Sequence, residues 1–280
     1  MSDNSTTLIA LGGDPTLAVS SAGRADRGRL LLVHGFGGAK EDFADWIDPL
    51  AATGWEVVAY DQRGHGESSG GEQSFSLQIF VDDLLALVDE LKWDRFVLLG
   101  HSMGGMVAQL VALAVPHRLA GLILMDTSHG PPDGLDPDQI ALGQQIVREG
   151  GMAALMEVQK ALGPGPLDSP AHLRLLKERP GYQEFCDRKS LATSASMWVS
   201  IVDEMIRQPD RLAALRQLAL PVLVIVGEED TGFLRQCQDI ADAIPGARLA
   251  VIGGAGHSPQ LESPDRWWKA VTAFLEEVQA

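Results

Sequence analysis

Six short runs of apolar residues recur along this chain of 280 residues, at 29–35, 55–62, 95–102, 119–126, 220–227 and 247–254. Continuous apolar runs of this length are typical of strands that are buried on both faces of a parallel sheet. Amphipathic segments lie between the runs, and in 75–91 the apolar residues recur at helical spacing. The alternation predicts an α/β fold with a doubly wound, mostly parallel sheet. Ahead of the first run, two short segments before Gly28 predict an antiparallel hairpin at the sheet edge.

The strand-like runs stop between about Ser128 and Gln208. Helical patterns replace them, at 136–149, 151–162, 170–179 and 189–206. We therefore expect a core domain formed by 1–127 and 209–280, with an inserted helical cap (a lid) at 128–208. Ligands of open α/β sheets bind at the carboxyl edge, so the cap is expected to cover that edge.

The composition narrows the possible partners. A formal net charge of −16 disfavours binding to a nucleic acid or an anionic lipid surface. No apolar run approaches the length of about 20 residues that a membrane-spanning helix needs. The first ten residues, MSDNSTTLIA, lack the basic and apolar regions of a signal peptide, so a cytoplasmic protein is expected.

The third apolar run, at 95–102, leads into Gly100-His101-Ser102-Met103-Gly104, which fits the pattern G-x-S-x-G. A strand precedes this pentapeptide and a helix follows it, which is the context that a nucleophilic serine on a sharp turn requires. Such a turn brings strand and helix close together, so the positions two before and two after the serine must be nearly free of side chain. The glycines at 100 and 104 meet that need, and Ser102 is the candidate nucleophile.

A serine needs a base to accept its proton and an acid to orient that base. Asp230 follows the apolar run at 220–227, and His257 follows the run at 247–254. Both are therefore expected at the carboxyl edge of the sheet, beside Ser102. Asp126 also ends an apolar run and is an alternative position for the acid.

Acyl transfer also needs two N–H donors for the oxyanion. We expect these from the backbone of Met103, directly after the nucleophile, and of Phe36 in the loop His34-Gly35-Phe36-Gly37-Gly38.

Three histidines near these motifs are expected to have structural rather than catalytic roles. His34 and His65 are expected to hold their own loops, and the side chain of His101 is expected to point away from Ser102.

Taken together, HGFGG (34–38), DQRGHGES (61–68), GHSMGG (100–105), GEED (227–230) and GAGHSPQLESP (254–264) resemble the α/β-hydrolase fold family over nearly the whole chain. The resemblance implies that Ser102 is the nucleophile, Asp230 the acid, His257 the general base, and Phe36 and Met103 the oxyanion donors. The motifs are most similar to those of serine esterases, enol-lactonases and monoacylglycerol lipases. Carbon–carbon bond hydrolases of the family tend to carry Asn before the serine and an aromatic residue after the histidine, where this chain has His101 and Ser258.

The resulting hypothesis is a serine hydrolase that cleaves a small or medium apolar carboxylic ester or lactone, with no metal and no organic cofactor. Residues of the cap and of the loop after Asp230 are expected to contact the substrate: Trp198, Met197 and Phe233. Two alternatives stay open. One is a carbon–carbon bond hydrolase that acts on vinylogous diketones, and the other is a ligand-binding sensor of slow turnover.

Overall fold

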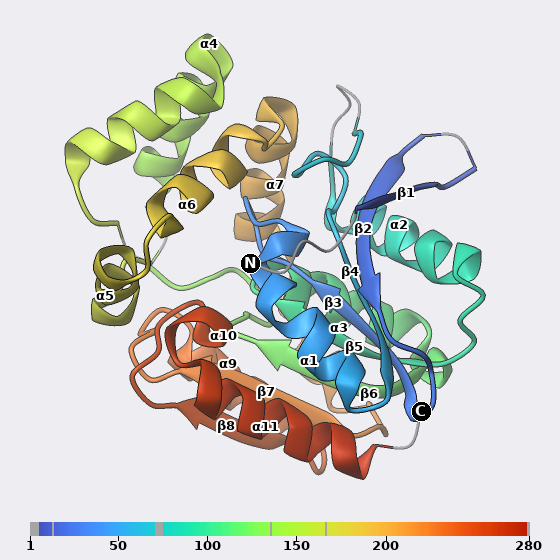
Figure 1. The fold of residues 1–280 in the computed structure, drawn as a ribbon. Helices are drawn as coiled ribbons and strands as arrows, with labels where there is room; N and C mark the ends of the chain where they lie inside the picture. The colour runs from blue at the N-terminus through green and yellow to red at the C-terminus, as the bar shows by residue number, and fades with distance from the viewer. Residues whose placement is uncertain (1–5, 13, 71–74, 135, 166, 279–280) are drawn as a thin grey trace.

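Figure 1 shows the fold of the computed structural model, which describes all residues except 1–5, 13, 71–74, 135, 166 and 279–280. In this described part, one sheet of eight strands is formed by β1 (Thr7–Ala10), β2 (Thr16–Ala22), β3 (Gly28–Val33), β4 (Trp55–Tyr60), β5 (Phe96–His101), β6 (Leu119–Met125), β7 (Val222–Gly227) and β8 (Arg248–Ile252). The helices of the core are α1 (Ala44–Ala52), α2 (Leu77–Glu90), α3 (Met103–Ala114), α8 (Leu212–Leu215), α9 (Leu234–Ala243), α10 (Pro259–Glu262) and α11 (Pro264–Glu277). Short 3-10 helices span Lys40–Phe43 (η1) and Pro116–Arg118 (η2).

The strands are ordered β1-β2-β4-β3-β5-β6-β7-β8. The pairs β1–β2 and β2–β4 are antiparallel, and all pairs from β4 to β8 are parallel. The six apolar runs correspond to β3 through β8, and the predicted hairpin is β1 with β2. The predicted α/β fold with a mostly parallel sheet is confirmed.

The central strands, β3 to β7, are buried on both faces of the sheet, which explains why they are apolar without alternation. Leu31 and Val33 belong to the cluster that also contains the apolar residues of α2, α3, α8 and α9. Leu30 and Leu32 belong to the cluster that contains those of α1 and α11. Successive residues of a strand point to opposite faces, so each layer of helices packs on its own set of side chains.

Four helices lie in the chain between β6 and α8: α4 (Pro137–Leu162), α5 (Pro170–Glu178), α6 (Tyr182–Leu191) and α7 (Ala195–Arg207). We call them the inserted helices. Gly151 interrupts α4 with a φ of 71°, close to the predicted break between 149 and 151. The prediction of one helix at 189–206 is wrong, because α6 ends at Leu191 and α7 starts anew. The side chain of Ser194 caps α7 by accepting a hydrogen bond from the N–H of Met197, and a cap of this kind favours a new helix start.

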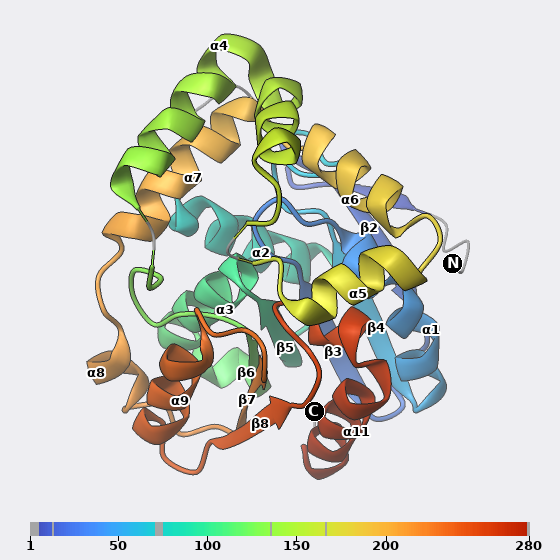
Figure 2. The ribbon, with the colours of Figure 1, turned by 90° about the vertical axis from the view of Figure 1, so that its left-hand side faces the viewer.

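The inserted helices lie against loops that follow the parallel strands, as Figures 1 and 2 show from two sides. Arg179 forms an ion pair of 2.7 Å with Asp45, and Lys189 pairs with Asp42. The backbone N–H of Ser194 donates to the carbonyl of Gly64. Three further contacts join α5 to the segments that follow β7 and β8. The N–H of Ala171 donates to Glu229 (2.6 Å), Arg174 donates to the carbonyl of Gly254 (2.8 Å), and His172 lies 3.8 Å from Glu262 at the end of α10. The inserted helices therefore stand over the carboxyl edge of the sheet.

Within the described residues, no helix combines the length and the hydropathy that crossing a membrane requires.

A bidentate ion pair holds the loop after β4 against α2. Arg63 donates from Nε to Asp83 Oδ2 at 2.7 Å and from Nη2 to Oδ1 at 2.5 Å. The two side chains are only 11% and 7% exposed. Removing one partner of such a pair leaves the other charge buried and unpaired.

We expect Asp83→Ala to lower the free energy of unfolding by about 3 kcal/mol, because Arg63 would lose its buried partner. Denaturant unfolding followed by circular dichroism measures this loss. Asp82→Ala is the matched control, since Asp82 is the exposed neighbour on the same helix, and we expect it to cost less than about 0.5 kcal/mol. Equal losses in the two variants would contradict the role assigned to the pair.

Candidate active site

Ser102 occupies a strained turn between β5 and α3. Its φ is 53° and its ψ is −119°, a conformation that non-glycine residues rarely adopt. A Cβ on Gly100 would lie 2.2 Å from the carbonyl oxygen of Gly104, and a Cβ on Gly104 would lie 2.5 Å from the carbonyl oxygens of both Val33 and His34. The backbones approach so closely here that only glycine fits at these two positions.

His257 lies between Ser102 and Asp230. Its Nδ1 is 2.8 Å from Asp230 Oδ2, and its Nε2 is 3.0 Å from Ser102 Oγ. A carboxylate can only accept, so Nδ1–H donates to Asp230, and Nε2 is left to accept the hydroxyl proton of Ser102. Asp230 is 5% exposed, which keeps this hydrogen bond away from water. The three residues that the sequence singled out for a triad are thus connected in a hydrogen-bonded chain.

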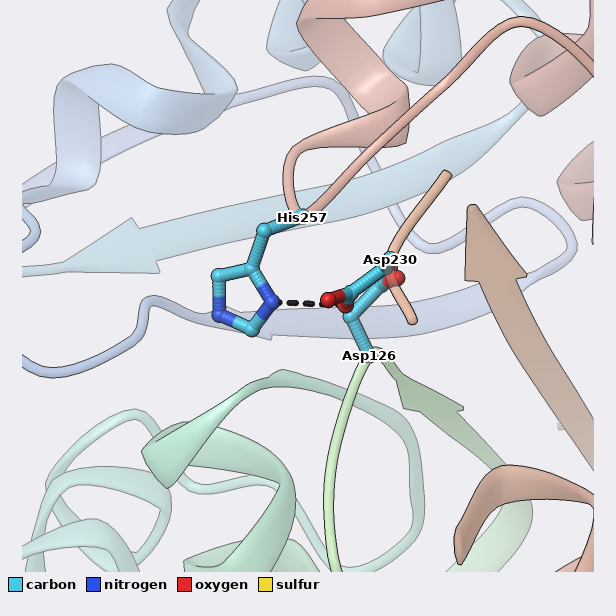
Figure 3. A group of neighbouring side chains, drawn as sticks. All are labelled: Asp126, Asp230 and His257. Carbon is cyan, nitrogen blue, oxygen red and sulfur yellow. Dashed lines mark hydrogen bonds and ion pairs between the residues drawn. The ribbon is translucent and has the colours of Figure 1, made fainter. Parts of the chain in front are cut away.

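Asp126 joins this group from the end of β6 (Figure 3). One ligand atom each from Asp126, Asp230 and His257 all lie within 4.8 Å of one another. Burial raises the pKa of Asp126 well above its ordinary value, and the neighbouring charge of Asp230 raises it further. Carboxylates and imidazoles are also metal ligands, but they bind metal in deprotonated form. The raised pKa of Asp126 and the hydrogen bond of His257 Nδ1 to Asp230 both favour bound protons at this cluster over a bound cation.

The loop after β3 passes directly beside Ser102. A Cβ on Gly35 would lie 3.0 Å from the Cβ of Ser102. Phe36 follows in this loop, and Met103 opens α3. In the described part of the chain, neither the Phe36 N–H nor the Met103 N–H has a hydrogen-bond acceptor. Two backbone donors are therefore free on residues adjacent to the hydroxyl-bearing turn.

Two buried histidines hold this loop, as expected for His34 and His65. The Nδ1 of His34 lies 2.8 Å from the carbonyl of Gly35, and its Nε2 accepts from the N–H of Gln62. The Nε2 of His65 accepts from the N–H of Gly37. Burial lowers the pKa of both rings, that of His65 to about 3, so both are neutral near pH 7.

The three residues expected to contact substrate lie at different depths. The ring of Phe233 is 4.8 Å from that of His257. The ring of Trp198, on α7, is 5.7 Å from that of Phe36. Met197 is fully buried and packs beneath Gly64, where a Cβ on the glycine would lie 3.0 Å from that of Met197. Their contact with a substrate stays a prediction.

Sequence analysis missed two side chains that hold the main chain of His257. The interpretation of His101 as a bystander did not foresee that its Nε2 lies 2.6 Å from the carbonyl oxygen of His257. Burial lowers the pKa of His101 to about 3, so the ring is neutral and Nε2–H donates. Glu262 accepts from the N–H groups of Gly256 (2.5 Å) and Ser258 (3.3 Å). The motif GHSMGG contains the first residue and GAGHSPQLESP the second, but nothing in the motifs shows what these side chains contact.

Comparisons with known proteins give this arrangement a context. A model of the alpha/beta hydrolase fold family matches residues 28–264. The chain is 29% identical over 281 residues to 2-hydroxymuconate semialdehyde hydrolase of a Pseudomonas species, covering 98% of this chain and 94% of that protein. Among solved structures, a thermophilic esterase from Thermogutta terrifontis is 27% identical with a TM-score of 0.82, covering 99% of this chain and 100% of the other. The enol-lactonase from Burkholderia xenovorans has a TM-score of 0.83 over 97% of this chain and 100% of its own, and at 24% identity this likeness shows the shared fold.

The close packing of the turn around Ser102 predicts that substitution of its glycines lowers the stability of the fold. A methyl group at Gly104 would collide with two backbone carbonyls, so we expect Gly104→Ala to cost about 1–3 kcal/mol. Thermal unfolding by calorimetry should then show a Tm several degrees below that of the parent protein. Gly165→Ala is the control, because a Cβ there would meet its nearest atom at 3.7 Å, an ordinary contact. A Gly104→Ala protein as stable as this control would refute the close approach.

Proposed function

Because this chain belongs to the alpha/beta hydrolase fold family, we propose that it is a serine hydrolase that cleaves a small or medium carboxylic ester or lactone through an acyl-enzyme. The observation that carries this proposal is the chain of two hydrogen bonds, 3.0 Å and 2.8 Å long, from Ser102 through His257 to Asp230. A nucleophile, a base and an orienting acid linked at these distances are the requirements for nucleophilic acyl transfer.

The mechanism follows from the positions of the protons. His257 Nε2 takes the hydroxyl proton as Ser102 Oγ attacks the carbonyl carbon. Negative charge develops on the carbonyl oxygen and is stabilised by the free N–H groups of Phe36 and Met103. The imidazolium, steadied by Asp230, then gives its proton to the leaving alkoxide. A water molecule repeats the same steps to release the acid.

One comparison and the charge of this chain support the class of substrate. The Thermogutta protein is an esterase and is 27% identical over nearly the whole chain. A neutral His101 and a neutral His65 leave the surroundings of Ser102 without extra positive charge. Together with the net charge of −16, this disfavours anionic substrates and favours an apolar acyl group.

We further propose that residues 128–208 act as a cap that closes over the substrate. The ion pairs Arg179–Asp45 and Lys189–Asp42 support it, because both join residues between 128 and 208 to η1 and α1 of the core, which follow the loop of Phe36. In this arrangement Trp198 and Phe233 contact the substrate, whereas the burial of Met197 against Gly64 favours a packing role for that side chain. A site covered in this way suits single molecules rather than large lipid droplets.

A second candidate function is hydrolysis of a carbon–carbon bond. The 29% identical Pseudomonas relative favours it, because its name gives a semialdehyde, not an ester, as the compound that it hydrolyses. The same Ser102, His257 and Asp230 would serve. The residues that flank Ser102 and His257 on this chain, His101 and Ser258, favour the ester or lactone hypothesis.

We expect the purified protein to hydrolyse p-nitrophenyl butyrate and Ser102→Ala to lower kcat by about 10⁶-fold, because the acyl-enzyme can no longer form. A serine-directed phosphonate should add to Ser102 alone, as mass spectrometry of the digested protein would show. Ser21→Ala, at an exposed position of β2, is the matched control and should keep full activity. If neither hydrolysis nor labelling occurs, the hydrolase proposal is wrong and a ligand-binding sensor is the better hypothesis.

A substrate panel separates the two candidate reactions. Esters of increasing acyl length, lactones and vinylogous diketones are compared by kcat/KM under one set of conditions. We expect esters or lactones to exceed the diketones by at least about tenfold, a difference of about 1.4 kcal/mol in transition-state binding. The reverse order would favour carbon–carbon bond hydrolysis.

A further inference from the structure

Two buried carboxyl groups meet beside His257, and the proposed mechanism uses only one of them. Asp126 is fully buried at the end of β6, and Asp230 is 5% exposed after β7. Figure 3 shows their carboxyl groups side by side, with His257 bonded to Asp230. An oxygen of Asp126 and a ring nitrogen of His257 are also within 4.8 Å of each other. The carboxyl group of Asp126 therefore lies near enough to His257 to affect the charge of the imidazole ring.

The hydrogen bonds of Asp126 leave one of its oxygens without a donor. Its Oδ1 accepts from the N–H of Gly227 at 2.8 Å. Its Oδ2 is buried and, among the described residues, has no N–H or O–H donor. Its backbone is also strained, with a φ of 45°. A buried carboxylate oxygen without a donor is costly, whereas a protonated oxygen next to an ionised carboxylate is not.

We propose that Asp126 is a second acid of the active site, which holds a proton beside ionised Asp230 and can replace Asp230 as the partner of His257. This inference rests on the proposed function. In the intact site Asp126 is a positioning residue that limits repulsion at Asp230 and keeps that carboxylate directed at His257. When Asp230 is removed, Asp126 loses its proton to solvent and its carboxylate stabilises the imidazolium that forms during the reaction.

The other titratable groups around Asp126 agree with a protonated state. Asp230, Glu262 and the Cys237 thiol face it, as does His257. Asp230 and Glu262 both act to raise the pKa of Asp126, and burial acts in the same direction. Burial also raises the pKa of Cys237 well above its ordinary value, so this thiol stays neutral and contributes no compensating charge.

The kinetic test compares Asp126→Asn in two backgrounds with p-nitrophenyl butyrate as substrate. In the parent protein we expect a loss of only a few-fold in kcat/KM, because asparagine still accepts from Gly227 and still donates to Asp230. Asp230→Ala should lose about 10²–10³-fold, less than the roughly 10⁴-fold loss typical when a triad acid has no substitute. In the Asp230→Ala background, Asp126→Asn should cost at least a further tenfold.

Glu262→Gln in the Asp230→Ala background is the matched control. Glu262 also acts on His257 through its charge, but it is bonded to the backbone N–H groups of Gly256 and Ser258. We expect this change to cost less there than Asp126→Asn does. The proposal is overturned if Asp126→Asn has the same effect in both backgrounds, or if Glu262→Gln costs as much.

A second measurement tests whether Asp126 is protonated and does not depend on enzymatic activity. A carboxyl group whose pKa is raised by folding takes up a proton on folding at a pH between its unfolded pKa, about 3.9, and its folded pKa, so stability falls as pH rises through this range. Asparagine removes this penalty. The Tm of Asp126→Asn relative to the parent should therefore be higher at pH 8 than at pH 5, whereas an equal difference at the two pH values would show that Asp126 is ionised. A protein without esterase activity would refute the proposed function, and this Tm comparison would still decide whether Asp126 holds the proton.

Discussion

The close contact between the end of β5 and the start of α3 is the constraint on which the site depends. The carbonyl oxygen of Gly104 lies where any side chain on Gly100 would have to be. The backbones of β5 and α3 are therefore in direct contact. Ser102, at the point of the turn, is forced to a φ of 53°. The strain is held by the apolar clusters on both faces of the sheet, which fix β5 and α3 independently of the serine.

The backbone around His257 is held in place by two neighbouring side chains. His101 bonds the carbonyl oxygen of His257, and Glu262 bonds the N–H groups on either side of it. The imidazole is therefore attached to a segment fixed from two directions. The neighbouring side chains add little charge: burial lowers the pKa of His101 to about 3, which keeps that ring neutral, and burial raises the pKa of Asp126. A base in such surroundings changes charge without a large rearrangement of nearby groups.

The predictable part of this molecule is the part determined by local pattern and by sheet topology. The apolar runs indicated β3 to β7 because those strands are buried on both faces, and β8 because its run is apolar although the strand lies at the half-exposed sheet edge. Parallel strands bring the segments after β5, β7 and β8 to one edge. This is why Ser102, Asp230 and His257, far apart in the chain, could be named together. The roles of His101 and Glu262 could not be foreseen, since each depends on which backbone group a folded loop presents to it. The break between α6 and α7 was missed for a similar reason: the pattern at 189–206 is helical, and the capping hydroxyl of Ser194 decides where the helix begins.

The contact of Phe36 with Trp198 joins the inserted helices to the chemistry. Phe36 offers one of the two free N–H groups beside Ser102, and its ring packs on an indole carried by α7. A displacement of α7 that opened a path to the site would remove this support from the loop of Phe36. Under the proposed mechanism, a position of α7 that admits substrate would then be one in which the Phe36 N–H is less well held for the oxyanion. A molecule built this way would couple the position of α7 to the placement of the proposed oxyanion donor, through a single contact between two aromatic rings.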